Sequence, residues 1–182
     1  MRRLLVQLVV FGSVIGLLAA CSAPVTSARL QFSLSESGDL GYEVDEDTIT
    51  ITSRNLRFRN TSGGHGVTIT DYRISFFNNA GVAVAGGSQS GSVSVFVPAG
   101  ILCDNVDPVY GCELGAPGWR FAPGVEVVSP QSYQLMPLPV VVAHINAGQP
   151  IGWYGEIEFT GFNATGGAFT TEPYVVAIAP PN

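Results

Sequence analysis

The stretch that decides the fold is the closing segment Gly152–Pro180, which reads GWYGEIEFTGFNATGGAFTTEPYVVAIAP. Its first part alternates apolar and polar residues, and this period of two places one set on each face of a β-strand. The two sets are Trp153, Ile157 and Phe159, and Tyr154, Glu156 and Glu158. Turn-forming residues follow at Asn163–Gly167. The alternation then resumes at Tyr174, Val176 and Ile178. The segment therefore predicts a β-hairpin with one buried face.

Five groups of residues upstream repeat the same period. They are Leu30, Phe32 and Leu34; Ile49 and Ile51; Leu56 and Phe58; Tyr72, Ile74 and Phe76; and Val93, Val95 and Val97. The alternation changes phase within Ser53–Asn55 and again between Ile69 and Tyr72. Because one inserted residue shifts a strand by one position against its partner, we expect a β-bulge or a strand break at both places.

Turn residues divide the rest of the chain into further short strands. Asn78–Gly81 predicts a hairpin turn, and Gly86-Gly87 with Ser90-Gly91 predicts another loop. More strands are expected at Val125–Val128, Tyr133–Leu135 and Val140–Ile145. Pro137 and Pro139 indicate an edge or a kink, since proline cannot donate to a ladder.

These patterns give eight or nine short strands and no helix after residue 20, so we expect an all-β fold of two antiparallel sheets over residues 29–182. The closing hairpin resembles the last two strands of bacterial immunoglobulin-like or fibronectin-type-III-like domains. The resemblance implies an immunoglobulin-like sandwich. The cysteine–tryptophan–cysteine core spacing of antibody domains is absent.

The N-terminus has the pattern of a secretory signal peptide. Met1-Arg2-Arg3 precedes a mainly apolar run of 17 residues, Leu4–Ala20, which predicts a signal helix over residues 1–20. Leu18-Ala19-Ala20-Cys21 resembles the lipobox of bacterial lipoproteins. The resemblance implies that the signal is removed, that Cys21 carries a diacylglyceryl group, and that residues 21–28 tether the domain to a membrane.

Two alternatives for the N-terminus stay open. One is an ordinary signal peptide followed by a free Cys21. The other is a transmembrane helix, although the apolar run is at the lower limit for a bilayer core of about 30 Å. Within the lipoprotein resemblance, Ser22 after the lipidated position implies the outer membrane or cell surface rather than the inner membrane.

The composition limits the expected partners. Without residues 1–20 the chain has 162 residues, with six arginines against 14 acidic residues and a net charge of −8. That length suits one domain. An acidic domain with few cations excludes nucleic acid as the expected partner and provides no attraction to an anionic membrane surface. Membrane attachment is therefore expected through the lipid on Cys21.

Cys103 and Cys112 remain once Cys21 is assigned to lipid. In an exported chain such a pair predicts a disulfide, and Asp107-Pro108 with Gly111 can turn the chain between them. Metal ligation is the competing interpretation, but it needs more ligands than this stretch provides. We expect residues 99–124 to form one long loop stapled by the disulfide.

Three aromatic residues of this loop, Tyr110, Trp119 and Phe121, are the candidate contact surface for a ligand or partner. The alternative is that Trp119 fills the core beneath its own loop.

No catalytic motif is present, and no cofactor or metal is expected. His65 lies in a glycine-rich loop and His144 in a strand-like pattern. The acidic groups Glu43, Asp45, Glu46 and Asp47, and Asp104, Asn105 and Asp107, lack the spacing of a calcium loop and are interpreted as solvated turns. Glu156 and Glu158 are interpreted as a polar strand face.

We therefore expect a lipid-anchored, non-enzymatic module of the cell envelope with a protein partner. The alternative is a surface lipoprotein that binds carbohydrate or peptidoglycan through Tyr110, Trp119 and Phe121. Three exposed aromatic residues in a groove would favour the carbohydrate, and a flat apolar patch or a free sheet edge would favour the protein partner.

Overall fold

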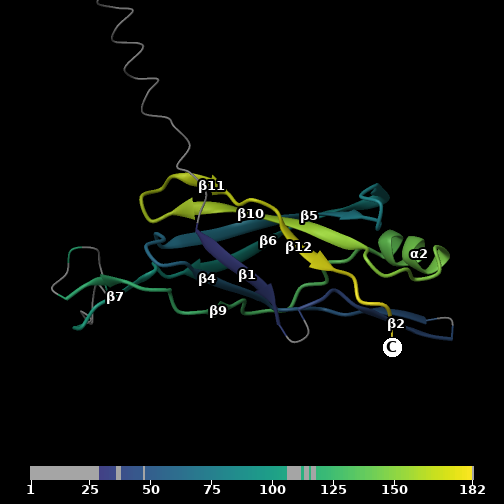
Figure 1. Ribbon diagram of the computed structural model, residues 1–182, viewed down its shortest axis with the longest axis horizontal. Helices are drawn as coiled ribbons and strands as arrows, with labels where there is room; N and C mark the ends of the chain where they lie inside the picture. The colour runs from purple at the N-terminus through teal and green to yellow at the C-terminus, as the bar shows by residue number, and fades with distance from the viewer. Residues whose placement is uncertain are drawn as a thin grey trace, which may run out of the picture.

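A computed structural model of the chain describes residues 29–35, 38–46, 48–105, 112, 115 and 118–181. The expected signal peptide, Cys21 and the tether 21–28 lie outside these residues, and so does Tyr110. The described residues form twelve β-strands and one helix. The elements build an elongated molecule in which two sheets lie one over the other (Figure 1).

The larger sheet has five antiparallel strands and contains the closing hairpin. Its strands are β5 (Val67–Phe77), β6 (Ala83–Val97), β10 (Tyr154–Asn163), β11 (Ala168–Thr170) and β12 (Tyr174–Ala177). The order is β11-β10-β5-β6, and β12 pairs with β10 beyond the end of β11. The sequence prediction of the hairpin is confirmed, with the returning strand interrupted at residues 171–173.

The smaller sheet consists of β1 (Leu30–Leu34), β4 (Leu56–Asn60) and β9 (Val127–Val128), in the order β1-β4-β9. Its inner face packs on the larger sheet. The ring centroids of Phe32 and Phe58 lie 4.8 and 4.9 Å from that of Phe159, which belongs to β10. The hydroxyl of Tyr174 donates to the carbonyl of Leu30 at 2.6 Å, so β12 is joined to β1 across the layers.

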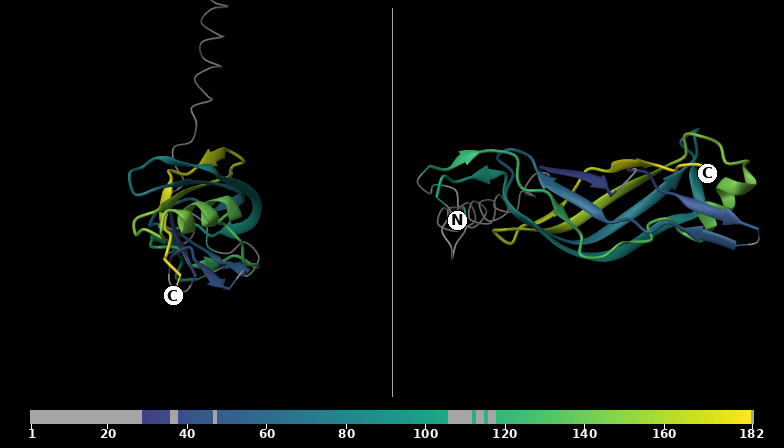
Figure 2. Two further views of the ribbon diagram at one scale, coloured as in Figure 1. Left: turned by 90° about the vertical axis from the view of Figure 1, so that its right-hand side faces the viewer. Right: turned by 90° about the horizontal axis from the view of Figure 1, so that it is seen from below.

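Two small hairpins lie at opposite ends of the molecule (Figures 1 and 2). One consists of β2 (Tyr42–Asp45) and β3 (Thr48–Ile51), and the other of β7 (Ile101–Leu102) and β8 (Arg120–Phe121). Cys103 and Cys112 beside β7 form a disulfide with an S–S length of 2.06 Å, which confirms the predicted pairing.

A helix stands where a strand was expected. Leu138–Asn146 is α2, so the prediction of a strand at Val140–Ile145 and of no helix after the signal is wrong. Pro139 occupies the second helical position, where its missing N–H costs no helical bond. Val140, Val141 and His144 are buried at helical spacing. Among the residues described, no helix is long and apolar enough to cross a membrane.

Both expected phase changes correspond to irregularities. Residues 52–55 separate β3 from β4 and belong to no strand, although Arg54 forms an isolated bridge with Tyr133. Thr70 of β5 has no paired residue in either neighbouring strand. Its neighbours Ile69 and Asp71 pair with consecutive residues of β10. The phase change before Tyr72 is therefore a β-bulge.

The loop expected around Gly86-Gly87 and Ser90-Gly91 is absent, because β6 runs through both pairs. At Gly91 a glycine is needed for space. An added Cβ would lie 2.7 Å from a ring carbon of Tyr72 on the neighbouring strand. Gly91 therefore admits an aromatic ring rather than ending the strand.

Candidate functional site

The second edge of β6 has no strand partner. β6 pairs with β5 along one side, and residues 83–97 make no other backbone-to-backbone hydrogen bond to the described part of the chain. Asn60 donates its side-chain amide to the Val97 carbonyl at 3.4 Å, and β9 packs beside the strand without pairing. The open edge of β6, meaning this unpaired side of residues 83–97, is therefore an unused row of backbone donors and acceptors.

The open edge also lacks the usual protection against strand pairing. No residue of Ala83–Val97 is charged, and none is proline. Natural edge strands are commonly blocked by lysine, proline or a short length, whereas β6 has 15 residues. The strand itself carries one such device, a bulge with Gly86 at φ 68° and a register shift opposite Ser75–Phe77, and α2 packs against β6 with Pro139 beside Gly86. The chemistry of this edge suits an added extended strand.

The outer face of the larger sheet is polar in its middle. Arg73 donates to Glu158 at 2.6 Å, and the Ser92 hydroxyl donates to Asp71 at 3.1 Å. Glu156 and Glu158 share this face, as the sequence predicted. Because Glu158 is bound to arginine on an exposed surface, the two carboxylates have the arrangement of a solvated ion-pair face rather than of an acid–base pair in a cleft.

Exposed aromatic residues gather at the end of the molecule where β1 begins. Trp119 and Phe121 are 36% and 59% exposed and pack edge to face with centroids 5.0 Å apart. The alternative interpretation, that Trp119 fills the core beneath its own loop, is therefore wrong. Phe96 and Phe162 are 60% and 50% exposed, and both pair with Thr68 from either side on the outer face. We call these four residues the aromatic end.

Asn60 connects the segments of this end, and sequence reasoning missed it because no local pattern marks this residue. The side chain is fully buried at the end of β4. Its amide group donates to the carbonyls of His65 and Pro98 at 2.8 and 2.7 Å, which joins the glycine-rich loop to the end of β6. The N–H of Gly63 in that loop donates to the Gly100 carbonyl at 2.8 Å.

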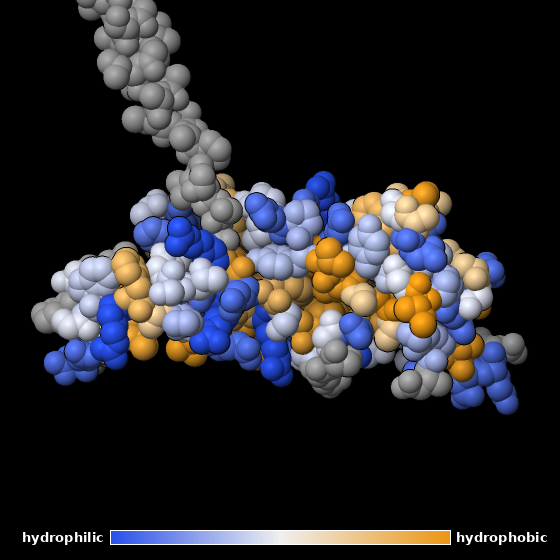
Figure 3. Space-filling model, viewed as in Figure 1, coloured by the Kyte–Doolittle hydropathy of each residue, from blue (hydrophilic) through white to orange (hydrophobic). Residues whose placement is uncertain are grey.

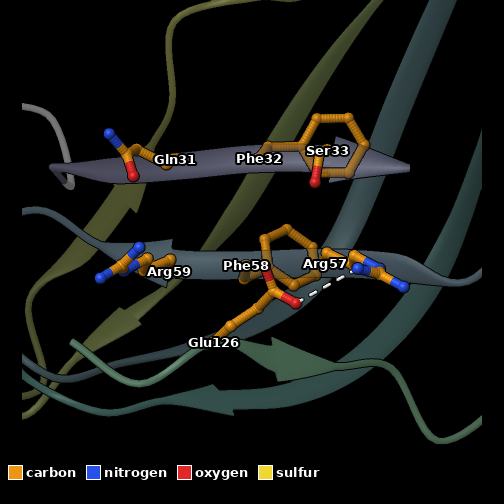
Figure 4. Close-up of a pocket in the computed structure, with 7 residues that line it drawn as sticks. All are labelled: Gln31, Phe32, Ser33, Arg57, Phe58, Arg59 and Glu126. Carbon is orange, nitrogen blue, oxygen red and sulfur yellow. Dashed lines mark hydrogen bonds and ion pairs between the residues drawn. The ribbon is translucent and has the colours of Figure 1, made fainter. Parts of the chain in front are cut away.

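A hollow of about 240 Å³ lies on the outer face of β1 and β4 (Figure 4). Its polar rim consists of Gln31, Ser33, Arg57, Arg59 and Glu126. Arg57 faces Glu126 at 3.4 Å, and the surface over these strands is mainly hydrophilic (Figure 3). Trp119 and Phe121 do not line this hollow. The guanidinium groups can bind a carbonyl or carboxylate oxygen, but Arg57 already has a carboxylate partner.

The two histidines lie at opposite ends of the molecule. His65 belongs to the loop bound by Asn60, whereas His144 is fully buried in α2. Nε2 of His144 lies 2.9 Å from the Pro150 carbonyl, which can only accept, so this nitrogen carries the hydrogen. Nδ1 then accepts from the Tyr42 hydroxyl at 2.8 Å. His144 therefore links α2 to Tyr42 and to the Pro150 carbonyl and does not meet His65.

The Tyr42 hydroxyl at this link has a shifted pKa. Burial raises the pKa of Tyr42 above its ordinary value, and a side-chain hydrogen bond with Gln149 partly offsets the effect. The pKa of Tyr174 is also raised, first by burial and second by the nearby Glu172 carboxylate. Both hydroxyls therefore stay protonated in the folded protein at neutral pH.

The acidic groups do not assemble into a cation site within the described residues, where no cluster of three metal-binding side chains occurs. Glu43 and Asp45 lie on β2, and Glu46 forms the turn of its hairpin with φ 48°. Asp104 pairs with Arg120 at 2.5 Å. Asp47 and Asp107 lie outside the described residues.

Comparison with known proteins gives no assignment. No protein-family model matches the chain, and no match is found among curated proteins.

Proposed function

We propose that the chain is a lipid-anchored protein of the bacterial cell envelope, held by a diacylglyceryl group on Cys21, that acts as a non-enzymatic interaction module. The observation that carries the interaction is the open edge of β6. A partner that supplies an extended segment would add a sixth strand to the larger sheet, with backbone hydrogen bonds providing affinity.

The anchor is supported by the sequence alone, through Leu18-Ala19-Ala20-Cys21 behind a signal-like run. We place the protein in the outer membrane or at the cell surface. The fold is proposed to be an immunoglobulin-like sandwich. A three-stranded antiparallel sheet packed on a five-stranded one supports this class, which commonly presents edges and end loops for binding.

The competing function is binding of carbohydrate or peptidoglycan by the aromatic residues. The exposure of Trp119 and Phe121 favours it. Against it, the two rings meet at 83° and do not form a flat platform on which a sugar ring could stack. The strand edge is therefore the better-supported site.

A crosslinking experiment tests the open edge. A photoreactive amino acid at Ser94 of the intact protein, in the envelope of its own cell, is expected to crosslink the partner. Ser88→Lys places a charge on the same exposed strand and is expected to abolish most of the product. Ser75→Lys is the matched control, because Ser75 is directly opposite Ser88 but lies on the central strand β5. Equal yields from Ser88→Lys and the unsubstituted chain would refute strand addition.

A further inference from the structure

We propose that the aromatic end, consisting of Phe96, Trp119, Phe121 and Phe162, lies in the interfacial layer of the same bilayer that holds the lipid on Cys21. The inference rests on the proposed lipid anchor and adds a second contact made by the protein itself. The aromatic end contacts the headgroup region of the bilayer, and this contact does not require anionic lipid.

The kind of apolar residue differs between the two ends of the molecule. Among the exposed large apolar residues of the described chain, four are aromatic, and these are the four residues of the aromatic end. All four lie at the end where β1 begins. The opposite end exposes only aliphatic residues of this set: Val44, Val82, Leu138, Val142 and Ile151. Tryptophan is enriched at membrane interfaces, since its amphipathic ring suits the headgroup level, and phenylalanine is among the apolar residues that interfacial segments bury at the boundary of headgroups and acyl chains.

The charges beside the rings do not oppose this contact. Arg120 lies between Trp119 and Phe121 and is paired with Asp104 at 2.5 Å. The outer face next to Phe96 and Phe162 carries Thr68 and Thr160, followed by Asp71, whose carboxylate accepts the Ser92 hydroxyl, and then by the Arg73–Glu158 pair. The residues directly beside the two rings are uncharged, and the exposed Asp71 can keep its carboxylate in water while the rings reach a zwitterionic interface.

The tether holds this end near the bilayer. The Thr61 N–H donates to the carbonyl of Arg29 at 2.8 Å, so the described chain begins at the aromatic end (Figure 1). Eight residues from Cys21 to Arg29 reach at most about 29 Å. The ten residues of β10 span about 33 Å toward α2. The domain can therefore stand on its aromatic end or lie on its side, but the tether is too short for it to stand on α2.

Tryptophan fluorescence tests the contact, because the chain has two tryptophans and they lie at opposite ends. The full lipid-bearing protein is reconstituted into vesicles of phosphatidylcholine with brominated acyl chains, which quench only nearby tryptophan. In Trp153→Phe, Trp119 is expected to lose about half of its fluorescence relative to unbrominated vesicles. In Trp119→Phe, the buried Trp153 beside His144 is expected to lose none.

A second pair of variants covers the chance that Trp153→Phe disturbs the core. In a chain without Trp119, a new tryptophan at Phe96 is expected to be quenched and one at Ile151 is not, although Ile151 is 82% exposed. Vesicles that carry the lipidated chain without quenching at positions 119 and 96 would overturn the docking and leave the anchor standing. A mass spectrum without lipid on Cys21 would overturn both the anchor and the docking.

Discussion

Asn60→Ala is expected to destabilise the protein more than any exposed substitution. The amide of Asn60 makes two hydrogen bonds shorter than 3 Å, to His65 and Pro98, inside a fully buried site. A net contribution of about 1 kcal/mol for each bond, together with the cost of two carbonyls left without a donor, gives a loss of about 2–4 kcal/mol in the free energy of unfolding. At a denaturant dependence of about 2 kcal/mol per molar, the urea midpoint falls by about 1–2 M.

Urea unfolding followed by the fluorescence of Trp153 measures this loss, because Trp153 lies at the other end and reports on the global transition. Asn60→Asp is the decisive comparison, since it keeps the volume and replaces the donor with an acceptor that faces carbonyl oxygens. We expect Asn60→Asp to be at least as destabilising as Asn60→Ala at pH 7 and to recover partly in acid, where a protonated carboxyl can donate. An unfolding free energy of Asn60→Asp within about 1 kcal/mol of the unsubstituted protein at pH 7 would show that the donor is not what holds this site.

Three further predictions concern other parts of the fold. Because the pKa of Tyr42 is raised in the folded state, its contribution to stability should be fully present below about pH 10 and be lost above it, and Tyr42→Phe should reduce the alkaline fall in stability in unfolding titrations. Cys112→Ser removes the bond between two cysteines that lie nine positions apart, and the free energy of unfolding should fall by about 2–3 kcal/mol as measured by calorimetry. An unchanged transition would mean that the loop unfolds independently of the domain. Gly91→Ala should displace the Tyr72 ring and cost about 1–3 kcal/mol, and a neutral result in thermal unfolding would contradict the tight approach.

The strands with one buried face were predictable from the sequence, because burial on one side imposes a period of two. Phe32, Phe58 and Phe159 all alternate with polar neighbours, and all three meet in the core. The bulge at Thr70 was predictable for the same reason, since an inserted residue reverses the pattern. The disulfide between Cys103 and Cys112 was predictable because two cysteines remain once Cys21 is assigned to lipid, and an exported chain meets oxidising conditions.

The remaining features depend on contacts between distant segments. Val140 and Val141 favour a strand by intrinsic preference, and only the packing of α2 against β6 and Trp153 shows why the helix is stable. Pro139 was the one local signal, because proline early in a helix is common. Gly91 resembled a turn residue until Tyr72 was placed beside it. The role of Asn60 depends on carbonyls 5 and 38 residues away, which no local pattern connects.

The closure of the fold by its last strands has a consequence for the export that we propose for this chain. Ile178 forms a parallel bridge with Leu40, and the Tyr174 hydroxyl reaches the Leu30 carbonyl, 144 residues earlier. The central strand β5 gains its second neighbour only when β10 arrives. Contacts so distant in sequence form slowly, because the loop they close must first lose its conformational freedom. A chain threaded from its N-terminus through a translocation channel would therefore stay unfolded until nearly all of it had crossed, and no folded plug would form in transit.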